Sequence, residues 1–135
     1  VPPTLDAAPI TIDPAALAHA ADSGLMELLT PDMGGTHVDL AVLTEAHGYA
    51  ASSVPIADLA IAAWLLSSAG IDTNDSLTGA AQSGGHRSSP VPMAADLTTV
   101  AVGRHVGEKE YLTLVSAPSL VAMSTLDLTR SWARV

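Results

Sequence analysis

The chain has 135 residues, a net charge of -9 and an apolar content of 48%, enough to build the core of one or two small domains. It contains no Cys, which excludes disulfides, thiolate metal sites and a catalytic thiol. No Lys or Arg precedes Arg87, whereas ten of the 14 Asp and Glu residues do, so the basic footprint that nucleic-acid binding requires is missing.

The first predicted helix begins at Asp13, the expected N-cap, with Pro14 at its first position. Leu17 and Leu25 follow at helical spacing, and the helix is expected to end by Leu29 or Thr30 because Pro31 cannot continue it. Gly24 weakens the middle of this predicted helix.

Two further helices are predicted before residue 70. Thr36 caps the second, with Asp39 at its third position, as in a capping box. The second helix presents one apolar face, made by Val38, Ala41, Val42, Ala46 and Tyr49. The third follows Ser52 or Ser53, has Pro55 in its first turn and stops at Gly70. Asp58 is its only charge, so this helix is expected to be buried on most sides, with Trp64 in the core.

The remainder of the chain has strand character. Residues 71–92 are rich in Gly, Ser, Asn, Asp and Pro, which predicts a loop. Strands are expected at Leu97–Val102 and Tyr111–Val115, joined by Gly103–Glu110 as a hairpin connection, with short strands at 119–123 and 131–135. The last strand is expected to be an edge that other residues or a partner chain continue. The predicted fold is α+β, an incomplete helical bundle at residues 1–70, a linker at 71–92 and part of a small antiparallel β domain at 93–135.

Several landmarks in order resemble the front part of the acyl-CoA dehydrogenase family. That family has a helical domain with a Gly-Leu pair, a Pro-Glu-x-x-Gly-Gly turn, a Glu-x-x-Gly helix and a Pro-started apolar helix ending in Gly. The matching residues are Gly24-Leu25, Pro31-Asp32-Met33-Gly34-Gly35, Glu45-Ala46-His47-Gly48, and Val54-Pro55 through Gly70. Residues 91–102 and 126–135 resemble strands of the family's middle β domain.

The resemblance implies α,β-dehydrogenation of an acyl-CoA thioester, with electrons passing to FAD. The family's flavin-wrapping signature, Thr-Glu-Pro followed by Gly-Ser-Asp, is not present in this sequence. Its catalytic base, a Glu in a C-terminal helical domain, is expected beyond Val135. FAD is therefore expected to be held mainly by other residues or by a partner, in a homo- or hetero-oligomer with an acyl-CoA dehydrogenase-like subunit. The Ala-rich, Lys-poor composition is typical of high-GC bacteria, where relatives often act on bulky sterol-derived acyl groups.

By the same resemblance, the substrate-facing turn consists of Pro31, Asp32, Met33, Gly34 and Gly35. The two glycines permit positive φ and a close approach of the backbone to a ligand, and the alternative is that turn geometry alone requires them. Glu45 and His47 invite an acid–base interpretation, but side chains two residues apart on a helix point in different directions. No His pair has metal-ligand spacing, and Ser83–Ser89 lacks the Lys and the following helix of a phosphate loop, so it is expected to be a linker.

Compartment and partners follow from what the sequence lacks. The sequence has no run of about 18 apolar residues, the length that would predict a membrane span. Its first residues lack the basic start and apolar core of a signal peptide. A cytoplasmic protein without membrane or nucleic-acid partners is therefore expected. The alternative to a flavoenzyme subunit is a non-catalytic interaction module that binds another protein and no flavin.

Overall fold

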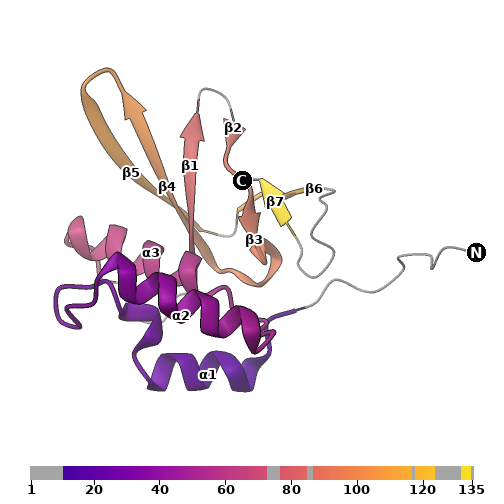
Figure 1. Ribbon diagram of the computed structural model, residues 1–135. Coiled ribbons are helices and arrows are strands. Elements are labelled where there is room, and N and C mark those ends of the chain that lie inside the picture. Colours follow the sequence, from indigo (N-terminus) through magenta and orange to yellow (C-terminus); the bar gives the residue numbers. More distant parts are fainter. Residues whose placement is uncertain (1–10, 73–76, 85–86, 117, 124–131, 135) are drawn as a thin grey trace, which may run out of the picture.

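A computed structural model describes residues 11–72, 77–84, 87–116, 118–123 and 132–134. Figure 1 shows the helices gathered on one side of the molecule and two small sheets on the other, which confirms an α+β fold in general terms. The helical elements are α1 (Pro14–Asp22), η1 (Leu25–Glu27), α2 (His37–Tyr49), α3 (Ile56–Ser68) and η2 (Ala94–Asp96). The strands are β1 (Thr78–Gly84), β2 (Arg87–Ser88), β3 (Val91–Pro92), β4 (Thr99–Val106), β5 (Lys109–Ser116), β6 (Val121–Met123) and β7 (Trp132–Arg134).

Helix α1 begins as predicted and ends earlier than predicted. The Asp13 carboxylate accepts from the backbone N–H of Ala15, and Pro14 occupies the first turn. The helix stops at Asp22 because Gly24 adopts a left-handed conformation with φ of 68° and starts the short helix η1. The prediction of one helix reaching Leu29 is therefore wrong, since Gly24 terminates it about two turns before Pro31.

Helix α2 has the predicted capping box but buries the face opposite to the predicted apolar one. Thr36 accepts from the backbone N–H of Asp39, and the Asp39 carboxylate accepts from the backbone N–H of Thr36. The core side of α2 is formed by Leu40, which is buried, and Leu43, which is half-buried. The apolar face made by Val38, Ala41, Val42, Ala46 and Tyr49 is exposed along its whole length.

Helix α3 is the central helix of the fold. It buries Ile56, Leu59, Ala60, Ala62 and Leu66, and most of its other residues are half-buried, which confirms the prediction from its nearly uniform apolar sequence. Pro55 is the N-cap residue, and Gly70, at φ of 67°, follows the last turn. Trp64 is 37% exposed and packs edge-to-face on the ring of His37, so the prediction that it lies in the core is wrong.

The first sheet has four strands in the order β2-β1-β4-β5. Strand β1 pairs in parallel with β4, whereas the β1–β2 and β4–β5 pairs are antiparallel, so the expected antiparallel sheet is in fact mixed. The described part of 71–92 contains three strands, β1, β2 and β3, and the prediction of a loop there is wrong. The small residues of this segment are typical of loops, but Gly79 is needed within β1. At this position β1 passes so close to Leu97 that a Cβ would overlap the leucine side chain.

The hairpin of β4 and β5 is longer than predicted. The two strands pair from Thr99↔Ser116 to Val106↔Lys109, and the turn is confined to Gly107 and Glu108, with Gly107 at φ of 63°. The residues predicted to connect the strands are therefore mostly in the strands themselves.

The second sheet has three strands in the order β3-β7-β6, all antiparallel. Strands β6 and β7 confirm the short strands predicted near 119–123 and 131–135. Because β7 lies between β3 and β6, the prediction that the last strand is an unpaired edge is wrong.

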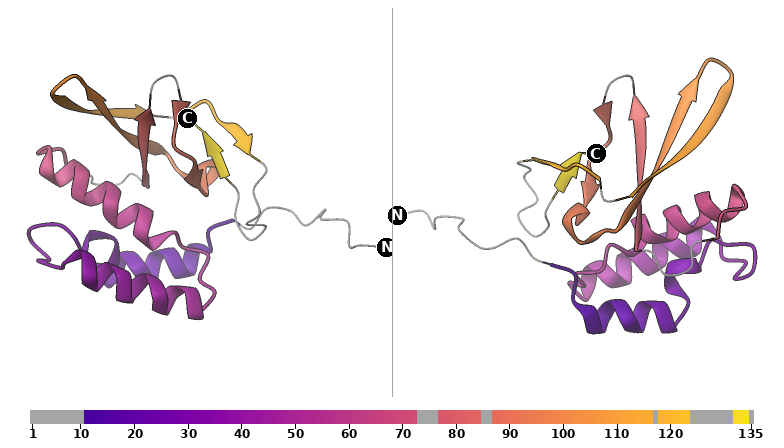
Figure 2. Two further views of the ribbon diagram at one scale, coloured as in Figure 1. Left: turned by 45° about the horizontal axis from the view of Figure 1, so that its top comes forward. Right: turned by 180° about the vertical axis from the view of Figure 1, so that it is seen from behind.

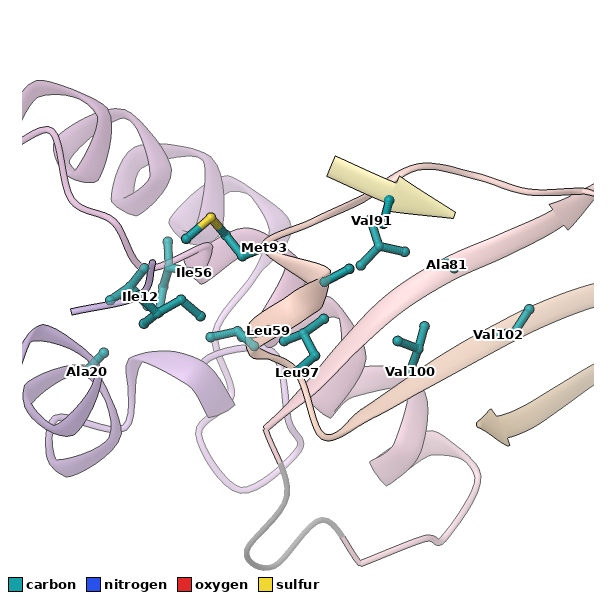
Figure 3. Close-up of a cluster of buried hydrophobic side chains, with 13 residues drawn as sticks. Ile12, Ala20, Ile56, Leu59, Ala81, Val91, Met93, Leu97, Val100 and Val102 are labelled. Carbon is teal, nitrogen blue, oxygen red and sulfur yellow. The ribbon is translucent and has the colours of Figure 1, made fainter. Parts of the chain in front are cut away.

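The main hydrophobic cluster joins the helices to both sheets. Figure 3 shows Ile12, Ile56 and Leu59 from the helical side meeting Met93 and Leu97 from the segment before β4. Val91 on β3, Val100 on β4 and Ala133 on β7 belong to the same cluster. A second, smaller cluster of Leu29, Leu40 and Ala60 joins α2 and α3 to the segment after η1. This second cluster fixes the position of the turn that follows Leu29.

Candidate functional site

The Pro31–Gly35 turn lies between η1 and α2 and is held by its own backbone. The backbone N–H groups of Met33 and Gly34 donate to the carbonyl of Thr30, with N···O distances of 3.2 and 3.0 Å. The N–H of Gly35 donates to the carbonyl of Leu28 at 2.9 Å. Gly34 has φ of 68°, which requires a glycine-like backbone at that position. The turn is therefore preformed, and no ligand is needed to shape it.

The side chains of the turn point outward. Pro31, Asp32 and Met33 are exposed, with Met33 at 49% of its full exposure. The Met33 side chain lies over Gly24, where an added Cβ would come within 3.0 Å of the methionine methyl group. The left-handed φ of 68° favours glycine at position 24, and the contact covers only one side of the flexible, polarisable Met33 side chain.

The two glycines of the turn have different roles. A Cβ on Gly35 would overlap the backbone and side chain of Leu28, so tight packing explains this glycine. A Cβ on Gly34 would have no atom within 4 Å, so only the positive φ restricts that position. Close backbone approach to a ligand is therefore available at Gly34, whereas Gly35 faces the protein.

Glu45 and His47 lie on opposite sides of α2, as their spacing predicts. Glu45 is exposed on the outer side, and His47 is half-buried on the core side. The Nδ1 atom of His47 is buried and lacks a hydrogen-bond partner among the described residues. The two side chains cannot act as one acid–base pair because the helix separates them.

The remaining candidates give no cluster of titratable groups. Within the described ranges, no three His, Asp or Glu side chains are placed to hold a metal ion. His19, His37 and His105 are exposed on three different elements, and His86 lies outside the described residues. The described ends of the predicted Ser83–Ser89 linker belong to the paired antiparallel strands β1 and β2 instead, with Ser83 opposite Ser88.

The electrostatics of the turn do not favour a phosphate group. Residues 11–72 contain no Lys or Arg, so the helical part has no cationic side chain to offer to FAD or CoA. The basic residues with described side chains are Arg104 and Lys109 on the β4–β5 hairpin and Arg134 on β7. The residues around the turn therefore do not fit the phosphates of FAD.

The exposure of the predicted apolar face of α2 was not expected from the sequence. Val38, Val42 and Tyr49 are 72%, 63% and 87% exposed, and they line one side of α2 together with Glu45. The signal was present, because Leu40 and Leu43 make a second apolar side on the same helix. Helix α2 therefore buries one of its two apolar sides in the core and exposes the other.

Comparison with protein-family models, with curated proteins and with solved structures finds no match to this chain. In the part of the chain that the structure describes, no helix has the length and apolar character needed to cross a membrane.

Proposed function

We propose that this chain is a subunit or segment of an FAD-dependent acyl-CoA dehydrogenase, which performs α,β-dehydrogenation of an acyl-CoA thioester. Its helical part would present the Pro31–Gly35 turn to the acyl group. The observation that carries the proposal is the construction of this turn, whose backbone is fixed by three hydrogen bonds while Pro31, Asp32 and Met33 remain exposed. A fixed turn with outward side chains can orient a substrate without being reshaped by it.

The order of structural elements supports the proposal alongside the turn. Glu45 to Gly48 lie within α2, Pro55 caps α3, and Gly70 follows its end. The strands then follow the helices, which is the order that the sequence resemblance implies. The resemblance itself comes from the sequence. In the structure, the Pro31–Gly35 turn is the part that we propose to contact the acyl group.

The cofactor and the catalytic base are assigned to other residues or to a partner. The helical part has no Lys or Arg for the phosphates of FAD, and the resemblance implies that the catalytic Glu belongs to the family's C-terminal helical domain. We therefore assign to this chain the positioning of the acyl group, and to the rest of the assembly the binding of FAD and the proton abstraction.

Purification through a tag on this chain, from the cells that produce it, tests the proposal. The assembly should contain a second polypeptide or a longer form of this chain, and its absorption spectrum should show a flavin band. Acyl-CoA thioesters ranging from short linear chains to sterol-derived side chains should then be oxidised. A colourless protein that oxidises none of them would contradict the proposal.

The second candidate function is a non-catalytic interaction module. The exposed apolar side of α2 favours it, because exposed apolar patches on small domains commonly mark binding surfaces. This function requires neither flavin nor acyl-CoA. A stable, colourless complex with another protein would support it over the dehydrogenase.

A further inference from the structure

The outer stripe of α2 consists of Val38, Val42, Glu45 and Tyr49. These residues occupy positions i, i+4, i+7 and i+11 of the helix, so their side chains line up on one side. In the left view of Figure 2, α2 lies at the lower margin of the helical group, away from the sheets. Spacing of this kind is the one by which a helix recognises another apolar helix or groove.

The flanks of the stripe leave space for a second helix. Ala41 and Ala46 lie on either side of it, and both are exposed. Their small side chains allow a neighbouring helix to approach the backbone of α2. The protruding side chains of Val42 and Tyr49 would then insert between the residues of that helix.

The charge distribution decides between a second copy and a different partner. Glu45 is one of the two middle residues of the stripe, and residues 11–72 provide no Lys or Arg to pair with it. The described basic side chains, Arg104, Lys109 and Arg134, belong to the sheets, so a contact between two α2 helices does not bring them to Glu45. In a two-fold contact between two α2 helices, both Glu45 carboxylates would lie in the same interface, surrounded by apolar side chains. Like charges in such surroundings oppose association, and the net charge of -9 on each copy adds to the repulsion.

We propose that the outer stripe of α2 binds an apolar helix of a different protein, in which a Lys or Arg faces Glu45. The basic side chain would pair with the carboxylate at the centre, and apolar side chains would cover Val38, Val42 and Tyr49. This inference rests on the proposed function only in that the chain acts within an assembly, and it does not depend on flavin.

Site-specific photo-cross-linking tests where the partner binds. A benzoylphenylalanine at position 49 replaces an aromatic residue that is 87% exposed, so it should not disturb the fold. The same group at the exposed Ala18 on α1 is the position control. The proposal expects a cross-link from position 49, and not from 18, to an apolar segment of another protein that contains Lys or Arg. Cross-links only between copies of this chain, or none above the control, would overturn it.

Binding measurements on the purified pair then test the chemistry. Val42→Asp places a charge in the apolar stripe and should weaken binding by roughly 100-fold, because it desolvates an unpaired carboxylate. Glu45→Gln should weaken binding by about tenfold and Glu45→Lys by more, since the second change sets like charges against each other. Glu27→Lys, at an exposed residue of η1, is the matched charge control and should leave affinity within about threefold.

The outcomes separate this inference from the dehydrogenase proposal. Circular dichroism of each variant checks that the exposed substitutions leave the fold intact. If Glu45→Lys binds as tightly as the unmodified chain, the assignment of a basic partner is wrong even when the assembly contains flavin. If binding behaves as expected and no flavin is present, the dehydrogenase proposal fails and this inference stands.

Discussion

Alanine at Gly34 and at Gly35 should have different costs, although the two glycines are adjacent. At Gly35 an added methyl group overlaps the backbone carbonyl of Leu28 and approaches its Cδ1 and Cγ atoms to 2.6 and 2.8 Å. Overpacking of this kind costs about 1–3 kcal/mol. The shift needed to relieve it also weakens the hydrogen bond from Gly35 to Leu28, which adds about 1 kcal/mol. Gly35→Ala should therefore lower the free energy of unfolding by about 2–4 kcal/mol.

At Gly34 the space is open and only the backbone conformation opposes a side chain. The left-handed φ of 68° costs an alanine about 1–2 kcal/mol, and the loss of freedom in the unfolded chain offsets about half of that. Gly34→Ala should therefore cost about 1 kcal/mol. Gly34→Asn should cost less still, because Asn tolerates this conformation better than alanine. Urea unfolding followed by circular dichroism measures the free energy of unfolding of all three variants. A Gly34→Ala variant less stable than Gly35→Ala would refute the geometry of the turn.

Two further predictions concern pH and the cofactor. The hydroxyl and backbone N–H of Thr36 donate hydrogen bonds to the Asp39 carboxylate and lower its pKa below the usual value of 3.8. The stabilisation of α2 by this capping box is therefore complete above that pH and is lost as the pH falls through the lowered pKa. Asp39→Asn should remove the dependence, as measured by helical circular dichroism from about pH 5 to 2. The chain alone should not bind FAD tightly, because residues 11–72 lack Lys and Arg. Fluorescence titration checks this, and tight one-to-one binding would contradict it.

The helical part of the fold was largely predictable because its signals are local. The Asp13 cap, the capping box of Thr36 and Asp39, and Gly70 after α3 are each read from neighbouring residues, and each is present in the structure. The early end of α1 was missed because a glycine within a helical pattern can either interrupt the helix or be tolerated, and the local sequence does not distinguish the two outcomes. Gly24 interrupts it by adopting a left-handed conformation with φ of 68°, beside the Met33 side chain of the following turn.

The strands of residues 77–92 were not predictable from composition. Gly and Ser are typical of loops, yet Gly79 is required in β1 by the side chain of Leu97, far along the chain. The parallel pairing of β1 with β4 is likewise a long-range contact that local patterns do not specify.

For the candidate site, the glycine positions were predictable but their reasons were not. The sequence could not distinguish Gly34, which needs a positive φ, from Gly35, which packs on Leu28. It also assigned one apolar face to α2, whereas the buried side is formed by Leu40 and Leu43. The spacing of the apolar residues identifies α2 as a helix. Which of its two apolar sides is buried is decided by packing against α3 and Leu29.

The preference of the assembled enzyme for different acyl-CoA thioesters, measured with Met33→Ala, tests most directly whether the turn faces the acyl group. Met33 is 49% exposed, so truncation should cost about 1 kcal/mol, less than the roughly 2–5 kcal/mol typical of a core methionine, and Tm should fall by only about 3–5 °C. If Met33 contacts the acyl group, kcat/KM for long or bulky acyl-CoA thioesters should fall about tenfold relative to short ones, while the flavin content is unchanged. An unchanged preference, with or without a fall in Tm, would show that the Pro31–Gly35 turn does not face the acyl group.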